Sequence, residues 1–237
     1  MLQLNFSQII GKLDVKKVNK YIRILSIRDP NDAEFQQLFA DFFTLNPTYW
    51  VKNKQVVGTS GLTRKELFFS IFDKYIEMGK NNVDYSSIIQ DLSCVPMRKG
   101  NGNVQVSFSS KILHVIDNNK PIIDQKMLLK LANPASGFTS SVGLKVTGKK
   151  KPVVHVRNGT ICDVIKFYSD VEMYYPQLIS FNEQPKNSSE TYIGNGVFKS
   201  FGENATYFEN FNTWLQEQKI TDPISDVKKA DFWMWLA

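Results

Sequence analysis

The sequence predicts a mainly α-helical protein, a bundle of two helical groups with a long basic loop or a small hairpin as an excursion. Three observations support this fold class. Apolar residues recur at three- and four-residue steps over most of the chain, as in amphipathic helices. Capping residues, glycine and proline flank these stretches. The chain has 237 residues, of which 42% are hydrophobic, enough to form one substantial core.

Four helices are predicted in the N-terminal part of the chain. Their apolar side chains fall on one face, and their ranges are 14–27, 29–45, 63–79 and 84–95. Asp14 and Thr63 each carry the side-chain oxygen that an N-cap requires. Pro30 is placed in the first turn of the second helix, and Gly79 ends the third.

Five further helices are predicted downstream, near residues 108–116, 124–132, 158–181, 204–218 and 225–236. The stretch between the second and third of these contains no acidic residue and is rich in glycine, serine and lysine. Its part 144–156 alternates weakly between apolar and polar residues, which fits a small hairpin. The expected regions form one compact unit and are a helical region 1–95, a hairpin-like segment 96–132, a basic loop 133–158 and a helical region 159–237.

The positive charge of the chain is concentrated in its middle. The net charge is +6, yet residues 92–162 hold eleven Lys and Arg against two acidic residues, a local charge of +9. A basic segment of this kind indicates a polyanionic partner. We expect nucleic acid, because membrane binding would require a basic amphipathic helix with a strong apolar face, and the segment contains none.

Several classes of protein are not expected. No stretch approaches the roughly 20 apolar residues that cross a bilayer, and the N-terminus lacks the pattern of a signal peptide. Cys94 and Cys162 make no disulfide framework, which indicates a reducing, cytoplasmic location. With two histidines and no clustered ligand spacing, we expect no metal and no other cofactor. We also expect a monomer.

A lysine in the stretch SFSSKILHVIDNNKPIID (residues 107–124) is a candidate nucleophile. Lys111 lies at the border of an apolar stripe, close to the start of a helix expected to begin near Phe108. Burial and the positive end of a helix both disfavour an ammonium ion, and they lower the pKa of a lysine placed there. An amine activated in this way can attack carbon at neutral pH. A surface lysine that extends its charge into water is the structural alternative.

An aspartate at the end of the same stretch is a candidate proton acceptor. Asp124 follows the extended residues 121–123 and is placed at the N-cap of the next helix. Backbone N–H donors hold a capping carboxylate rigidly and keep it ionised. Such a group can accept a proton or stabilise a developing cation. Capping alone is the structural alternative.

This pair resembles the helix-hairpin-helix DNA glycosylase superfamily, in particular its lysine-bearing 8-oxoguanine-type members. In that family a lysine opens the second hairpin helix, and an aspartate follows after a Pro-Val/Ile-x-Asp turn. Lys111 and the run Pro121-Ile122-Ile123-Asp124 stand in that order, and the resemblance covers residues 98–131. The resemblance implies that Lys111 is a Schiff-base nucleophile on the deoxyribose C1′. It implies that Asp124 activates the amine and stabilises the oxocarbenium-like centre.

Further residues are expected to support catalysis or bind DNA. His114 lies three positions after Lys111 and could tune the amine, although a buried, hydrogen-bonded histidine is the common alternative. The family holds a DNA phosphate at a glycine turn before the lysine, and a serine-rich helix start can also bind phosphate. The expected DNA-binding residues are Arg98, Lys99, Gly100, Gly102, Ser109, Ser110, Lys145, Lys149, Lys150 and Lys151. The candidates for stacking on an extruded base are Trp50, Trp233 and Trp235, with core packing as their alternative.

Two functions therefore stand side by side. The first is a DNA glycosylase that excises a modified base, in repair or in defence against phages, with or without AP lyase activity. The second is a non-catalytic nucleic-acid-binding protein in a phage-defence or regulatory assembly. A nuclease is disfavoured, because the basic region has no cluster of carboxylates to hold Mg²⁺.

Overall fold

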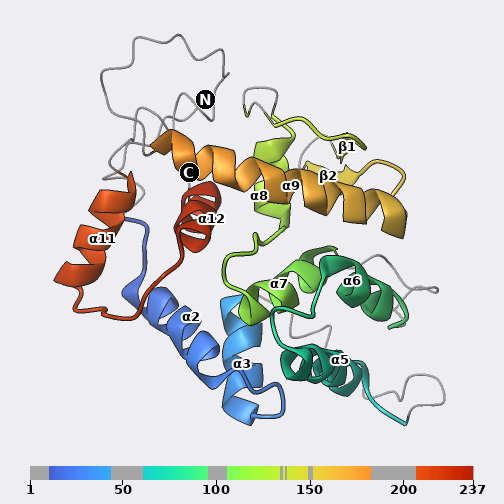
Figure 1. Cartoon of the computed structure of the whole chain (residues 1–237), viewed down its shortest axis with the longest axis horizontal. Helices are drawn as coiled ribbons and strands as arrows, with labels where there is room; N and C mark the ends of the chain where they lie inside the picture. The colour runs from blue at the N-terminus through green and yellow to red at the C-terminus, as the bar shows by residue number, and fades with distance from the viewer. Residues whose placement is uncertain are drawn as a thin grey trace. The chain divides into compact units, whose positions relative to one another are not determined.

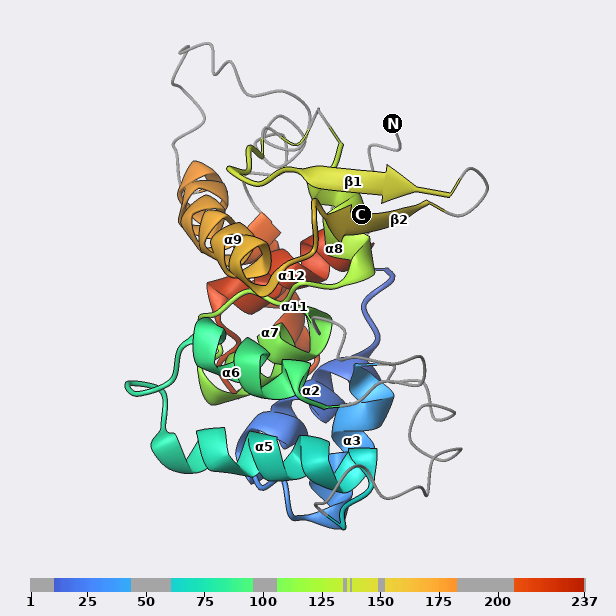
Figure 2. The same cartoon turned by 90° about the vertical axis from the view of Figure 1, so that its right-hand side faces the viewer.

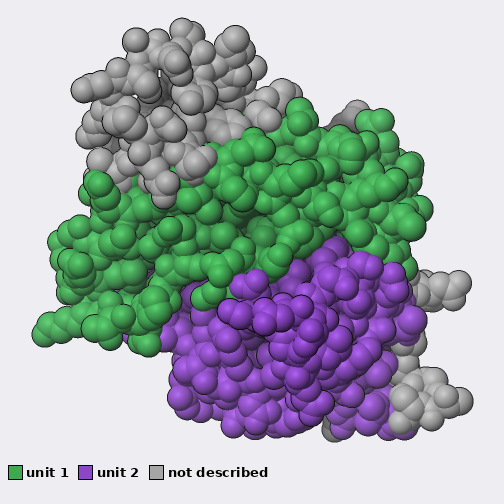
Figure 3. All heavy atoms as spheres, viewed as in Figure 1, with its two compact units in different colours: residues 1–14, 118–237 green, residues 15–117 purple. Residues whose placement is uncertain are grey.

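The structure, a computed structural model, describes residues 11–43, 61–95, 106–133, 136, 138–148, 152–182 and 207–236. These residues form nine helices and one two-stranded sheet, so the predicted mainly α fold is confirmed (Figure 1). The chain divides into two compact units, which Figure 3 colours separately. Unit 2 is residues 15–117, and unit 1 is residues 1–14 with 118–237. The predicted segment 96–132 is therefore divided between the two units.

The described part of unit 2 consists of helices only. They are α2 (Val15–Ile27), α3 (Ala33–Phe42), α5 (Arg64–Met78), α6 (Tyr85–Ser93) and α7 (Val106–Ile116). Helix α2 contacts α3, while α5, α6 and α7 contact one another. Helices α2, α3, α5 and α6 each bury one apolar face, as the three- and four-residue spacing of their side chains predicts, whereas residues 109–116 of α7 are all buried.

Aromatic rings fill the core of unit 2. Phe39 on α3 is fully buried, and its ring contacts the rings of five other phenylalanines. The centroid distances run from 4.7 Å to Phe43 up to 6.2 Å to Phe69. Tilted and edge-to-face pairs at these distances add stability beyond the burial of their area. These rings therefore hold α3 and α5 together in the core of unit 2.

The ends of α5 follow the sequence signals closely. Thr63 Oγ1 accepts the backbone N–H of Glu66 at 3.3 Å, and Glu66 Oε2 accepts the backbone N–H of Thr63 at 2.7 Å. This capping box satisfies two N–H groups that have no partner within the helix. Gly79 ends the helix with a φ of 71°, a conformation that a residue with a side chain rarely adopts.

Two helix starts differ from the prediction. Helix α3 begins after Asp32, whose side chain accepts the backbone N–H of Phe35 at 2.8 Å, so Pro30 precedes the helix instead of lying in its first turn. A carboxylate that can bond a free N–H defines the start more strongly than proline does. Helix α7 begins at Val106 instead of Phe108, which places the following residues deeper in the helix.

Unit 1 is arranged around its last helix. Its elements are α8 (Gln125–Leu131), β1 (Leu144–Thr147), β2 (Val153–Val156), α9 (Ile161–Asn182), α11 (Tyr207–Glu217) and α12 (Asp226–Leu236). Helix α12 contacts α8, α9 and α11, and its residues 228–234 are all buried. Residues 144–147 pair antiparallel with residues 153–156, so these two stretches form a hairpin (Figure 2). Strand β2 contacts α8 and α9.

Candidate functional site

Lys111 is a buried amine in the core of unit 2. The residue is 7% exposed, and its Nζ donates a hydrogen bond to Ser107 Oγ at 2.7 Å, one helical turn earlier. The Nζ also lies 5.6 Å from the ring centroid of Phe43 and 5.7 Å from that of Phe108. The electron-rich faces of these rings attract an ammonium ion, while burial disfavours it. Lys111 is therefore inside the helical unit and does not extend into water.

The position of Lys111 within α7 corrects one part of the sequence argument. Because α7 begins at Val106, Lys111 is the sixth residue of the helix and lies in its second turn. The effect of the helix dipole falls off within the first turn. The positive helix end therefore does not act on this amine as the sequence suggested, and the amine is instead surrounded by the core of unit 2.

His114 lies in the core of unit 2. The residue has no exposed surface, its Nε2 is 2.9 Å from the hydroxyl oxygen of Tyr21, and the two rings are 5.7 Å apart. One group donates and the other accepts, according to which ring nitrogen carries the proton. This contact joins α7 to α2. A catalytic role for His114 stays a prediction.

The two serines that precede Lys111 lie in the core of unit 2. Ser109 and Ser110 are fully buried, and the Ser110 hydroxyl donates to the backbone oxygen of Ser107 at 3.1 Å. Burial also raises the pKa of Tyr85 well above its usual value, and a hydrogen bond with Ser109 opposes this shift. Both side chains are buried, and the expectation that these hydroxyls contact DNA stays a prediction.

Asp124 is held at a fixed place in unit 1. It is the N-cap of α8, as predicted, and its Oδ1 accepts the backbone N–H of Met127 at 2.8 Å. The extended segment before it is anchored by Tyr168, whose hydroxyl donates to the backbone oxygen of Pro121 at 3.2 Å. Ile123 is fully buried. The carboxylate is half-buried, so it is positioned by backbone contacts on both sides and still reaches the edge of the unit.

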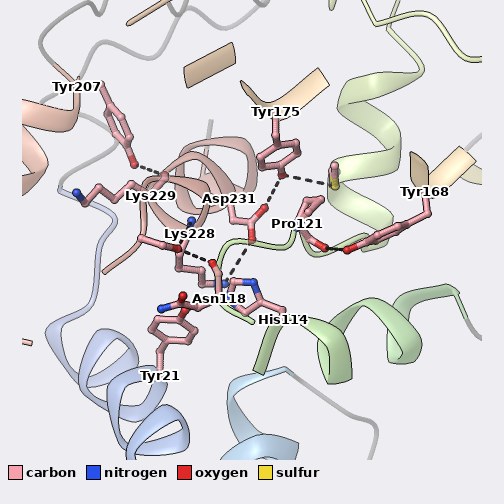
Figure 4. A network of polar contacts seen from close by, with 12 residues as sticks. Tyr21, His114, Asn118, Pro121, Tyr168, Tyr175, Tyr207, Lys228, Lys229 and Asp231 are labelled. Atoms are coloured by element: carbon pink, nitrogen blue, oxygen red, sulfur yellow. Dashed lines mark hydrogen bonds and ion pairs between the residues drawn. The ribbon is translucent and has the colours of Figure 1, made fainter. Parts of the chain in front are cut away.

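A buried polar network in unit 1 joins Tyr175, Lys228 and Asp231 (Figure 4). The Tyr175 hydroxyl on α9 donates a hydrogen bond to Asp231 Oδ1 on α12. Lys228 Nζ, one turn before Asp231, lies 3.9 Å from its Oδ2. All three side chains are buried. An acid, an amine and a phenol thus share one apolar interior.

Burial shifts the pKa of each member of this network. Burial raises the pKa of Asp231 to about 7, against the opposing effects of the Lys228 ammonium and the Tyr175 hydroxyl. Burial lowers the pKa of Lys228, and the negative charges of Asp231 and Asp124 oppose this shift. Burial, and then the charge of Asp231, raise the pKa of Tyr175 well above its usual value. Asp124 is therefore electrostatically coupled to Lys228, an amine of its own unit.

Sequence reasoning missed Lys228, Asp231 and Tyr175. One signal was present, because Lys228 and Asp231 stand three residues apart in the predicted helix 225–236 and therefore share one face of it. Strongly shifted pKa values are common at functional sites, although structural ion pairs also show them. The predicted partners belong to different units, Lys111 to unit 2 and Asp124 to unit 1, and their pairing stays a prediction.

The tryptophan candidates have different surroundings. Trp233 is 4% exposed and packs in the core of unit 1, which agrees with the core alternative, and stacking on an extruded base stays a prediction. Trp235 is half-buried, and Lys126 Nζ lies 4.5 Å from the centroid of its ring. A base that stacked on that face of Trp235 would displace the lysine. Trp50 lies outside the described residues.

Only part of the expected DNA-binding set can be placed. Lys145 lies on β1 and is exposed, as a phosphate contact requires. The remaining basic and glycine candidates lie outside the described residues, and they are Arg98, Lys99, Gly100, Gly102, Lys149, Lys150 and Lys151. Two further basic side chains of the same hairpin region, His155 and Arg157, are also exposed.

General comparisons add little to these observations. The described residues contain no group of three or more His, Cys, Asp and Glu that could hold a metal ion. No helix in the described part of the chain is long and apolar enough to span a membrane. Comparison with family models, with curated proteins and with solved structures finds no match for this chain. The function of the chain is therefore inferred from its own described residues.

Proposed function

We propose that the chain is a DNA N-glycosylase that excises a modified base, with Lys111 as the nucleophile and Asp124 as the activating acid. The observation that carries the proposal is the burial of Lys111. Its Nζ has a serine hydroxyl as a neutral partner and two aromatic rings around it. A buried lysine is costly to stability, and nucleophilic catalysis is one function that such an amine serves.

The surroundings of Lys111 suit an amine that must change its charge. Burial favours the neutral form, which is the nucleophile, whereas the rings of Phe43 and Phe108 favour the ammonium ion. Ser107 Oγ accepts from the ammonium ion and can also donate to the neutral amine. Both protonation states thus have a partner, which lowers the cost of passing between them.

The proposed reaction follows from these groups. The neutral amine of Lys111 attacks C1′ of the deoxyribose, and the N-glycosidic bond breaks as the base leaves with the bonding electrons and takes up a proton. Asp124 accepts the proton that the amine releases and stabilises the positive charge that develops at C1′. Opening of the sugar ring then leaves an imine between Nζ and C1′. Elimination of the 3′ phosphate from this imine would add AP lyase activity.

Positive charge supports DNA as the substrate. The local charge of +9 over residues 92–162 attracts phosphates, and binding should weaken steeply with salt. A base is excised more readily when it unstacks from the duplex at low cost and is a good leaving group from the sugar. An oxidised purine and a hypermodified phage base are therefore both candidate substrates.

Borohydride trapping tests the proposal. The chain is incubated with duplexes that carry oxidised purines or phage-type modified bases, and both free base and covalent adduct are measured. Lys111→Gln and Asp124→Asn should lose base release while they still bind DNA. Asn remains a good N-cap, so Asp124→Asn removes the charge and keeps the start of α8. Lys80→Gln, at an exposed lysine of unit 2, is the matched control and should retain activity.

A non-catalytic nucleic-acid-binding protein is the second candidate. It is favoured by the burial of Ser109 and Ser110, two of the phosphate contacts expected near the nucleophile. In that case modified and unmodified duplexes bind equally and no substrate in the panel releases a base. Base release without a trapped adduct would instead mean that water, and not Lys111, is the nucleophile.

A further inference from the structure

Strand β2 presents one face to the interior of unit 1 and one face away from it. Lys145 pairs with His155 and Val146 with Val154 in the antiparallel register. Since side chains alternate along a strand, Val154 and Val156 share a face, and they are 2% and 6% exposed. The backbone oxygen of Val154 also accepts Gln125 Nε2 of α8 at 3.0 Å. The hairpin is thus fixed to the unit through this face.

The opposite face of the hairpin carries basic side chains. Lys145 and His155 lie directly across from each other and are both exposed. Val153, on the same face, is 37% exposed. Lys145 therefore places an ammonium ion on this face, and an imidazole can donate a hydrogen bond to an anion beside it.

A further cation, the guanidinium of Arg157, lies at the end of the same hairpin. Arg157 follows β2, is exposed, and packs over Gly143, where an added Cβ atom would lie 3.5 Å from Arg157 Nε. The backbone N–H of Arg157 donates to the backbone oxygen of Gly143 at 3.1 Å, which fixes its position. In the described residues, no salt bridge is formed by Lys145, His155 or Arg157. Residues 133–158 contain no acid that could supply one.

We propose that this face, the hairpin face, docks onto duplex DNA as a two-stranded ribbon in the major groove. The hairpin face is defined by Lys145, Val153, His155 and the adjoining Arg157. Charge complementarity carries the proposal, because these cations have no salt bridge within the described chain and DNA supplies a dense row of phosphates. The sequence connecting the strands adds three lysines, Lys149 to Lys151.

The dimensions of a ribbon agree with this partner. Two paired strands lie about 4.8 Å apart, and a major groove about 12 Å wide admits a two-stranded ribbon. A four-residue strand spans about 13 Å, close to four base-pair steps of about 3.4 Å. Val153 then faces the base edges, where apolar side chains contact the thymine methyl group. The inference deepens the proposed function by naming a docking element, and it does not depend on Lys111.

The test measures how the affinity of the full chain for an unmodified duplex depends on salt. Each cation that contacts a phosphate contributes about 0.9 to the slope of log K against log salt concentration. A variant with Lys145→Gln, His155→Gln and Arg157→Gln should therefore lose about 1.8 from the slope if Lys145 and Arg157 both contact phosphates. Lys166→Gln, at an exposed lysine of α9 in the same unit, is the control and should leave the slope unchanged.

Several results would overturn the docking proposal. The proposal would be overturned if the triple variant kept the wild-type salt slope, or if Lys166→Gln lowered the slope as much as the triple variant does. It would also be overturned if the wild type did not bind duplex DNA. Hairpin-dependent binding to single strands, RNA or anionic vesicles in preference to duplex DNA would assign the face to another partner. The base-release assay separates the two proposals. If the salt slope depends on the hairpin residues and no base is released, docking is supported and the glycosylase proposal is refuted. If a base is released and the triple variant keeps the wild-type slope, the glycosylase is supported and docking is refuted.

Discussion

Replacing Asp231 with asparagine should change how the stability of the chain depends on pH. The pKa of the Asp231 carboxyl rises from 3.8 to about 7, chiefly because the group is buried. Its folded-state pKa is thus above its unfolded value, so the folded chain binds a proton that the unfolded chain has released. The carboxyl therefore supports the folded state at low pH, and the free energy of unfolding falls as pH rises toward about 7.

The size of the effect follows from the shift. A change of about three pKa units corresponds to about 4 kcal/mol at about 1.4 kcal/mol per unit. Asparagine cannot ionise, and its carbonyl oxygen can still accept the hydrogen bond from Tyr175. The variant should therefore gain stability relative to the wild type by about 3 kcal/mol between about pH 4 and about pH 6.

Urea denaturation followed by tryptophan fluorescence measures this difference. Three of the four tryptophans, Trp214, Trp233 and Trp235, lie in unit 1, so the signal reports on the unit that contains Asp231. Asp222→Asn, at an exposed aspartate of the same unit, is the matched control and should follow the wild-type curve. Parallel curves for the wild type and the Asp231→Asn variant over this pH range would refute the raised pKa.

A companion variant tests the role of the neighbouring amine. Lys228→Met removes the ammonium ion that lowers the pKa of Asp231 and replaces it with an apolar chain of similar length. The pKa of Asp231 should then rise further, so the loss of stability should continue above about pH 7. If the titration moved to lower pH instead, Lys228 would not be acting on Asp231 through its charge.

Three further predictions concern stability. Asp124→Ala should lower the free energy of unfolding by about 1 kcal/mol, because it removes the cap to Met127, and Asp124→Asn should lower it much less. Urea denaturation measures both. Equal losses would mean that the negative charge, not the cap, stabilises α8. Thr63→Ala should cost about 1 kcal/mol through loss of the capping box with Glu66, with a fall in the thermal midpoint. Phe39→Ala should cost roughly 3–5 kcal/mol, because it leaves a cavity among aromatic rings, and a loss below about 1 kcal/mol would show that the core of unit 2 collapses to fill it.

The helices were predictable because their signals are local. The spacing of apolar residues places α2, α3, α5 and α6 close to their observed ranges, and Thr63 and Asp124 are caps in the structure as in the prediction. A cap needs only a side chain and an N–H group three residues away. The hairpin was ambiguous from sequence, because pairing of β1 with β2 joins residues across a turn and the alternation is weak.

The candidate site was predictable only in part. The border position of Lys111 on an apolar stripe indicated partial burial, and the lysine is buried. The burial of Ser109 and Ser110 was not predicted. Helical periodicity identifies the apolar face of a helix, but it does not say whether neighbouring helices also cover the polar face. In α7, residues 109–116 are all buried, so its polar side chains turn inward with the others.

Sequence alone determined which segments are helical, the caps at Thr63 and Asp124, and where the positive charge gathers, since each of these depends on residues close together in the chain. Tertiary structure decided the environment of Asp231. Its partner Tyr175 is 56 residues away, on a different helix, and the carboxyl acquires its raised pKa only when α9 and α12 pack and exclude water from it. Desolvation is a property of all the neighbours of a group together, and a linear sequence does not specify which neighbours those are.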